Sequence, residues 1–113
     1  MIDVPPLMQR QAFTRPPPDQ VEALRGTPTG FIVDALGGSG ALDCRLRPAI
    51  AEQYAFCGVA LTVNAGPADN LALVQALRDV QPGDVLMAGT GGFTGCAITG
   101  DLVRGMAGNC GAV

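Results

Sequence analysis

The sequence contains no histidine and no lysine, and these two absences narrow the chemistry that its 113 residues can carry out. Without histidine there is no Ser-His-Asp or Cys-His catalysis, no imidazole base and no imidazole metal ligand. Without lysine there is no amine to form a Schiff base with a carbonyl substrate. Lyase chemistry on these residues would therefore depend on a metal ion or on electrostatic stabilisation.

The chain also has little of what marks a nucleic-acid or membrane protein. Its seven cations, all arginine, form no basic cluster and the net charge is −3, which argues against a phosphate-binding surface. The longest apolar stretch, residues 57–61, is too short to span a bilayer, and no signal peptide is visible. We expect a cytoplasmic protein that binds neither nucleic acid nor membrane. The cysteines show no Cys-x-x-Cys pairing and are typical of small buried side chains in a reducing compartment; they are Cys44, Cys57, Cys96 and Cys110.

The residues that are present indicate one small domain with short elements. Apolar residues make up 48% of the chain and charged residues 15%, which is the range of globular proteins. Tryptophan is absent, so aliphatic side chains must build the core, while 16 glycines and nine prolines predict many tight turns.

Apolar periodicity predicts strands and helices in alternation after a proline-rich start. At the amino end we expect an irregular arm (1–18), a helix at 19–25 closed by Gly26, and a helix from 27 with Pro28 at its first position. A strand at 55–63, buried on both faces, should follow, and then a helix at 70–80 capped by Asp69. The rest of the chain should form a strand at 84–88, a helix through residues 98–110, and the first step of a strand at 111–113. The strand-helix-strand order predicts the α/β class. We expect residues 1–26 to form the arm and a short helix. Residues 27–113 should form the domain, incomplete because it would stop at the beginning of a strand.

Two glycine-containing stretches are candidates for ligand binding. The loop at 89–95 follows a strand, but Thr94 stands where a dinucleotide-binding G-x-G-x-x-G motif needs glycine, and no acidic residue follows about 20 positions on. The helix start at residues 100–103 presents unpaired amides and a glycine that leaves room for an anion. Asp101 alone could instead be explained as a first-turn residue that complements the helix dipole.

Several segments taken together resemble one family, the regulator of RNase activity A-like (RraA-like) family with its 4-hydroxy-4-methyl-2-oxoglutarate aldolases. The resemblance covers residues 27–113 and lies in the segments Thr27–Leu36, Phe56–Val63, Asp69–Leu71, Pro82–Leu86 and Gly100–Leu102. It implies a three-layer β/β/α swivelling-type domain, assembled as a homotrimer or hexamer. It also implies cleavage of a 2-oxo acid to pyruvate with Mg²⁺ or Mn²⁺ as cofactor, and oxaloacetate decarboxylation as a side activity.

Within this resemblance, the main-chain amides of the Gly-Asp-Leu turn are expected to hold the pyruvate moiety; here they map onto Gly100, Asp101, Leu102 and Val103. The family's Gly-x-Val-Arg-Asp segment, whose arginine grips the substrate and whose aspartate anchors the metal through water, would follow Val113. We therefore expect no catalytic residue and no metal ligand among the 113 residues, and a fragment that is nearly inactive alone. The resemblance also leaves open a non-catalytic protein that binds and regulates a ribonuclease.

Overall fold

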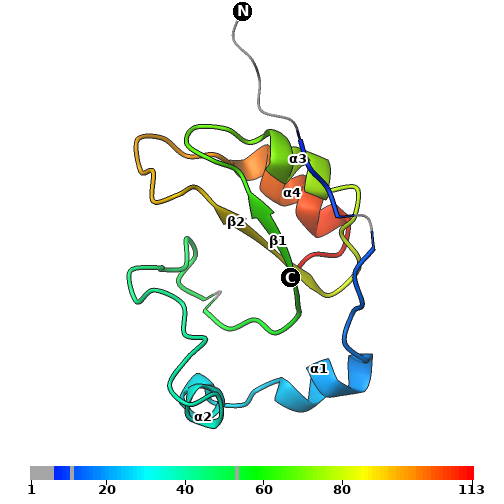
Figure 1. Ribbon diagram of the computed structural model, residues 1–113, viewed down its shortest axis with the longest axis vertical. Helices are drawn as coiled ribbons and strands as arrows, with labels where there is room; N and C mark the ends of the chain where they lie inside the picture. Colours follow the sequence, from blue (N-terminus) through cyan, green and yellow to red (C-terminus); the bar gives the residue numbers. More distant parts are fainter. Residues whose placement is uncertain (1–6, 11, 53) are drawn as a thin grey trace, which may run out of the picture.

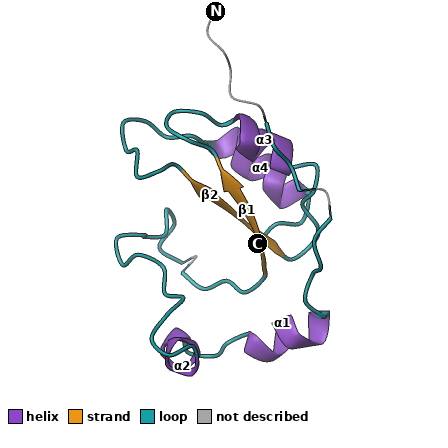
Figure 2. Ribbon diagram, viewed as in Figure 1, coloured by secondary structure: helices purple, strands orange, loops and turns teal. Residues whose placement is uncertain are grey.

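Two parallel strands form the centre of the structure, a computed structural model that describes residues 7–10, 12–52 and 54–113. Strand β1 (Val59–Asn64) is joined to β2 (Asp84–Gly89) through helix α3 (Leu71–Ala76), and α4 (Asp101–Asn109) follows β2. Helices α1 (Pro18–Leu24) and α2 (Thr29–Ala35) lie at one end of the long axis, away from the sheet (Figure 1). The predicted α/β class is confirmed at this level: a small mixed domain around a two-stranded parallel sheet (Figure 2).

The core lies between β1 and α3. The strands pair in register from Val59 opposite Asp84 to Asn64 opposite Gly89, so Leu61 lies beside Leu86. The buried apolar side chains come from β1, the turn after it and the crossover helix: Leu61, Ala65, Leu73, Ala76 and Leu77. Among the described residues every helix is too short to cross a lipid bilayer, the longest being the nine residues of α4.

The prediction of a strand at 55–63 buried on both faces is wrong in its start and in its burial. Strand β1 begins at Val59, and Phe56 lies outside it with 60% of its surface exposed. Along β1 burial alternates: Leu61 is buried, whereas its neighbours Ala60 and Thr62 are exposed. The cause is that α3 is the helix that packs against β1, and one helix can cover only one face of a strand.

The prediction of buried cysteines is also wrong. All four thiols are free; Cys57 is half-buried, with its Sγ 3.4 Å from the Val21 carbonyl oxygen, and the other three are exposed. The reason is the small size of the core, because none of the four cysteines belongs to β1 or α3, the elements that enclose it.

The crossover helix is shorter than predicted, and the buried side chains of α3 and its end are Leu73, Ala76 and Leu77. Leu77 and the following residues leave α3 in three-residue turns, with the N–H of Arg78 donating to the Gln75 carbonyl at 3.2 Å. Two other apolar side chains of the same helix, Leu71 and Val74, are 48% and 41% exposed. The predicted capping by Asp69 is close to what is seen: its carboxylate accepts the N–H of Leu71 at 2.8 Å, although the cap residue is Asn70.

The two short N-terminal helices lie where the sequence predicts them. Gly26, with φ of +74°, follows α1, and Gly37, with φ of +66°, follows α2. Pro28 is the cap residue of α2 rather than its first helical residue. Helix α4 begins at Asp101, where the glycine and acidic residue at 100–101 indicate a start, so the apolar periodicity that included Ile98 extended the helix too far and Ile98 belongs to the loop before it.

A buried ion pair ties the N-terminal arm to the sheet. Asp84 is the only described residue whose side chain is fully buried, and Arg15 donates to its carboxylate. The second Asp84 oxygen accepts the N–H of Gln81 at 2.8 Å, and Arg15 also donates to the Asp79 carbonyl at 3.2 Å. Phe13 lies under the Arg15 guanidinium, 5.0 Å from ring centre to Cζ. The carboxylate is thus paired and hydrogen-bonded, which burial of a charge requires.

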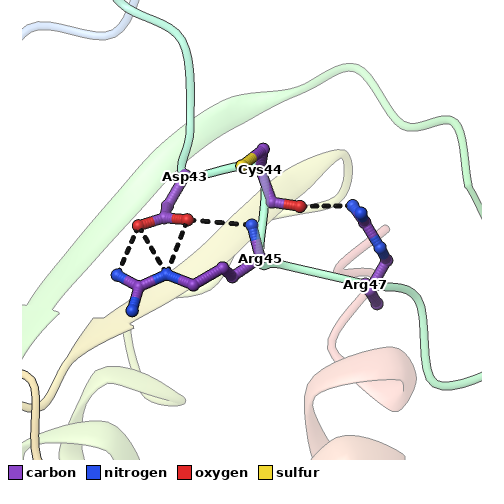
Figure 3. Close-up of polar contacts among 4 residues, drawn as sticks. All are labelled: Asp43, Cys44, Arg45 and Arg47. Atoms are coloured by element: carbon purple, nitrogen blue, oxygen red, sulfur yellow. Dashed lines mark hydrogen bonds and ion pairs between the residues drawn. The ribbon is translucent and has the colours of Figure 1, made fainter.

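A second ion pair shapes the long loop between α2 and β1. The Asp43 carboxylate accepts three bonds from the Arg45 side chain, at 2.6 to 3.1 Å, and the Arg45 N–H at 2.8 Å (Figure 3). The guanidinium, and next the backbone N–H, of Arg45 hold the pKa of Asp43 below its ordinary value. Arg47 turns away and donates to the carbonyls of Cys44 and Leu46 instead.

Replacing Arg15 alone should destabilise the fold more than replacing both Arg15 and Asp84 with neutral residues. Arg15→Met leaves a buried carboxylate without its counter-charge, and we expect a loss of about 3–5 kcal/mol in the free energy of unfolding. Adding Asp84→Asn to that variant removes the stranded charge while an amide oxygen still accepts the Gln81 N–H, so part of the loss should be recovered. Urea unfolding of the three proteins measures this; an Arg15→Met midpoint equal to that of the parent contradicts it.

The Asp43 carboxyl should titrate below an ordinary aspartate. Because its folded-state pKa is lowered, its contribution to stability is present above the unfolded-state pKa and is lost as the pH falls through the folded-state pKa. Carbonyl-detected NMR titration measures the midpoint. Arg45→Gln should raise it, and Arg47→Gln, which touches no Asp43 atom, should leave it unchanged; equal midpoints in all three proteins would show that the contact does not exist in solution.

Candidate functional site

The position of helix α4 is fixed from its C-terminal end. Gly111 follows the helix with φ of +93°, its N–H donates to the Gly108 carbonyl, and the N–H of Ala112 donates to Ala107, which together form a Schellman motif. The Gly111 carbonyl then accepts the N–H of Gly83 at 2.8 Å. A side chain at 111 would meet Pro82 at 2.8 Å, so this close approach requires glycine.

Residues 111–113, where the sequence predicts the first step of a strand, do not form one, but they run beside the beginning of β2. The Val113 N–H donates to the Asp84 carbonyl at 2.9 Å, close to the Gly83–Gly111 bond. The end of α4 is therefore held at the amino end of β2. Because the loop from β2 to α4 leaves from the other end of that strand, the start of α4 is directed toward the carboxyl end of the sheet, the end where ligands of open α/β sheets bind.

The candidate ligand-binding amides lie at the start of α4. Gly100 is the cap residue in an extended conformation, and its carbonyl accepts the Arg104 N–H at 3.0 Å. The N–H groups of the next three residues, Asp101, Leu102 and Val103, precede any intrahelical acceptor, and no side chain caps them. A Cβ atom built on Gly100 meets no atom within 4 Å, so the approach to these amides is open. The four predicted residues thus lie together at one helix terminus.

This terminus is an exposed surface rather than a pocket. Leu102 is 85% exposed, Val103 is half-buried, and the Asp101 carboxylate extends into solvent, 4.0 Å from the Arg104 guanidinium. An anion placed on the amides would gain the partial positive charge of the helix start, and Arg104 offsets part of the negative charge of Asp101. Chemically, the site can hold a carboxylate or a carbonyl oxygen, but it encloses neither.

The glycine-rich loop before α4 closes on itself. Thr90 donates its hydroxyl to the Phe93 carbonyl at 3.1 Å, and the Thr90 carbonyl accepts the Phe93 N–H at 3.3 Å, with Gly91 and Gly92 at positive φ between them. The Phe93 ring lies over Gly95, where a Cβ atom would come within 2.4 Å of it. These glycines are explained by a tight turn and an aromatic contact.

Two grooves of the described residues lie away from this terminus. One, of about 760 Å³, runs between the N-terminal arm, β1 and α3, where Leu7, Phe13, Val63 and Gln75 are among its lining residues. The other, of about 600 Å³, is lined by Arg10, Ala12, Phe13, Thr14, Arg15, Arg78, Asp79, Val80 and Gln81, and we call it the arginine groove. Neither groove includes residues 100–103.

The residues that the structure describes do not gather a metal site. No three histidine, cysteine, aspartate or glutamate side chains come close enough to share an ion within these ranges. Asp101 stands alone at the α4 terminus, and a single exposed carboxylate does not meet the ligand number that Mg²⁺ or Mn²⁺ needs. The side chains at this terminus therefore do not fit a divalent cation by themselves.

The buried ion pair and the arginine groove were not predicted from the sequence. The local pattern explains Asp84 as part of a Pro-Gly-Asp turn and the arm containing Arg15 as irregular. One signal was available: an aspartate at the first position of an apolar strand is a polar group that must find a partner if the strand is buried.

Comparison with known proteins places the chain in a family. The model of the RraA-like family, described as Aldolase/RraA, matches residues 29–113. A protein of Halalkalibacterium halodurans named "Putative 4-hydroxy-4-methyl-2-oxoglutarate aldolase" is 38% identical over 89 residues, which cover 79% of this chain and 42% of that protein. The chain thus spans less than half the length of this relative. No solved structure matches the chain. Because the family model covers most of the sequence, including both strands and the α4 terminus, the chain belongs to the RraA-like family.

Proposed function

We propose that the whole protein is an aldolase that cleaves a 2-oxo acid of the 4-hydroxy-4-methyl-2-oxoglutarate type to pyruvate, and that it decarboxylates oxaloacetate as a side activity. The proposal rests on family membership and on the name of the relative from Halalkalibacterium halodurans. The single observation that supports it in the structure is the open α4 terminus, where the amides of residues 101–103 are uncapped next to a glycine.

The role proposed for this chain is to bind the pyruvate end of the substrate. The carboxylate and keto oxygens accept the N–H groups that follow Gly100, and the positive end of α4 favours the negative charge that develops on the keto oxygen when the carbon–carbon bond breaks. Asp101, with its carboxylate directed into solvent, contributes its amide rather than its side chain. Because the chain has no lysine, it forms no Schiff base with the keto group.

We further propose that a divalent cation, Mg²⁺ or Mn²⁺, supplies the Lewis acid for this reaction. Its ligands are outside the described residues, which bring no suitable set together. From the same resemblance we propose the three-layer β/β/α swivelling-type architecture and a trimeric or hexameric assembly. The exposure of the α4 terminus supports an assembly, since a second copy or a further segment would be needed to enclose the substrate.

Adding a side chain at Gly100 should weaken substrate binding without unfolding the protein. Gly100 has an extended backbone and free space at its Cβ, so Gly100→Val strains nothing in this chain. The new side chain blocks the amides, and loss of one hydrogen bond to a charged group raises KM for oxaloacetate by about tenfold or more. Steady-state kinetics of the whole protein measure this.

Gly105→Val is the matched control for that experiment. It adds the same side chain to the same helix, also into free space, but one turn away from the terminus. Its KM should stay close to the parental value. If Gly100→Val leaves KM unchanged, or if both variants raise it equally, the α4 terminus is not the substrate site.

Turnover by the whole protein should require a divalent cation. Chelation should abolish oxaloacetate decarboxylation, Mg²⁺ or Mn²⁺ should restore it, and borohydride added with pyruvate should leave no covalent adduct on these residues, which lack an amine side chain. Activity assays with and without chelator, together with intact-mass measurement, test both points. Full activity in excess chelator would refute the metal-dependent assignment.

A further inference from the structure

The arginine groove gathers three of the seven arginines of an acidic chain at one place. Arg10 and Arg15 come from the N-terminal arm, and Arg78 comes from the turn after α3. The arm is held against this turn by contacts at both ends: Arg15 donates to the Asp79 carbonyl, and Gln9 donates to the Asp79 carboxylate. The groove is therefore formed by tertiary structure, since its charges come from segments that are distant in sequence.

The arginine groove has more positively charged side chains than negatively charged ones among its described lining residues. Arg15 is matched by the buried Asp84, and Phe13 packs against its guanidinium, so this side chain is fixed as a wall of the groove. Asp79 is the one carboxylate among the described lining residues, against the guanidinium groups of Arg10 and Arg78. Within the described part of the chain, neither of these two arginines forms an ion pair.

We propose that the arginine groove binds a small oxyanion, a carboxylate or a phosphate, through the guanidinium groups of Arg10 and Arg78. Planar guanidinium groups donate in pairs to the oxygens of either anion, which is the chemistry that both ligands share. A volume of about 600 Å³ accommodates a small molecule and is open enough for it to enter from solvent.

This site is separate from the α4 terminus proposed to bind the substrate. The groove adjoins Gln81, which precedes β2, and the bond from Gly83 to Gly111 places the C-terminal end of α4 near it. The start of α4 points toward the opposite end of the sheet. An anion in the groove and an anion on the α4 amides therefore occupy different places, and one inference can fail while the other holds.

The test is an NMR titration of the chain at mildly acidic pH, where the arginine Nε–H protons exchange slowly enough to be observed. Sodium phosphate and sodium acetate are added separately at constant ionic strength, and both the arginine Nε–H signals and the backbone amides of residues 101–103 are followed. We expect saturable shifts of Arg10 and Arg78 with at least one anion; the anion with the lower Kd identifies the ligand class. Shifts confined to residues 101–103, or no saturable shift of Arg10 and Arg78, overturn the proposal.

Arg78→Gln and Arg47→Gln form a matched pair of variants. Both remove one positive charge, but Arg47 lies in the exposed loop, and among the described residues its side chain donates to the carbonyls of Cys44 and Leu46. Arg78→Gln should weaken the binding seen at Arg10 by about tenfold or more, because a charge-assisted bond is lost, while Arg47→Gln should leave Kd unchanged. Equal weakening in both variants would show general charge attraction rather than a site, and an unchanged Kd in Arg78→Gln would equally overturn the proposal.

Discussion

The burial of the Asp84 carboxylate is the constraint on which the rest of this fold depends. A charge taken out of water must be matched in place, and here the Arg15 guanidinium and the Gln81 N–H both contribute. The same residue pairs with Val59 across the sheet, and its carbonyl accepts the N–H of Val113. Four segments that are distant in sequence therefore meet at a single residue: the arm, the beginning of β1, the turn before β2 and the segment after α4.

This convergence divides the sheet into two ends with different properties. The amino end is held by the ion pair and by glycines that allow close backbone approach: Gly58, whose Cβ would lie 2.1 Å from the Gly83 carbonyl, and Gly111 against Pro82. The carboxyl end carries a glycine-rich loop and the exposed start of α4. The amino end thus sets the direction of α4, and the carboxyl end presents the unpaired amides of that helix. This arrangement is expected of a binding site that a scaffold supports.

The structural features that could be predicted from the sequence are those that depend on residues adjacent in the chain. The starts of β2 and α4 follow from local signals, a Pro-Gly turn before Asp84 and a glycine followed by an acidic residue at Gly100, and these signals coincide with the observed starts at Asp84 and Asp101. The burial of β1 could not be predicted in the same way. Ala60 is compatible with either a covered or an exposed face, and which one it occupies depends on where α3 packs. The Arg15–Asp84 pair joins residues 69 positions apart, and no local pattern encodes such a partner.

The absence of lysine also explains how charge is distributed over the structure. Every cation is a planar guanidinium, which pairs with carboxylates and carbonyls in fixed geometry. In the part of the chain that the structure describes, four of these groups lie within 4.0 Å of a carboxylate: Arg15, Arg25, Arg45 and Arg104. Three of the four pairs link residues two or three positions apart, so local sequence is enough to form them. Arg15 instead pairs across the fold, and by doing so it brings the arm, with Arg10, beside Arg78. This long-range ion pair thus both closes the amino end of the sheet and creates the local excess of positive charge in an otherwise acidic chain.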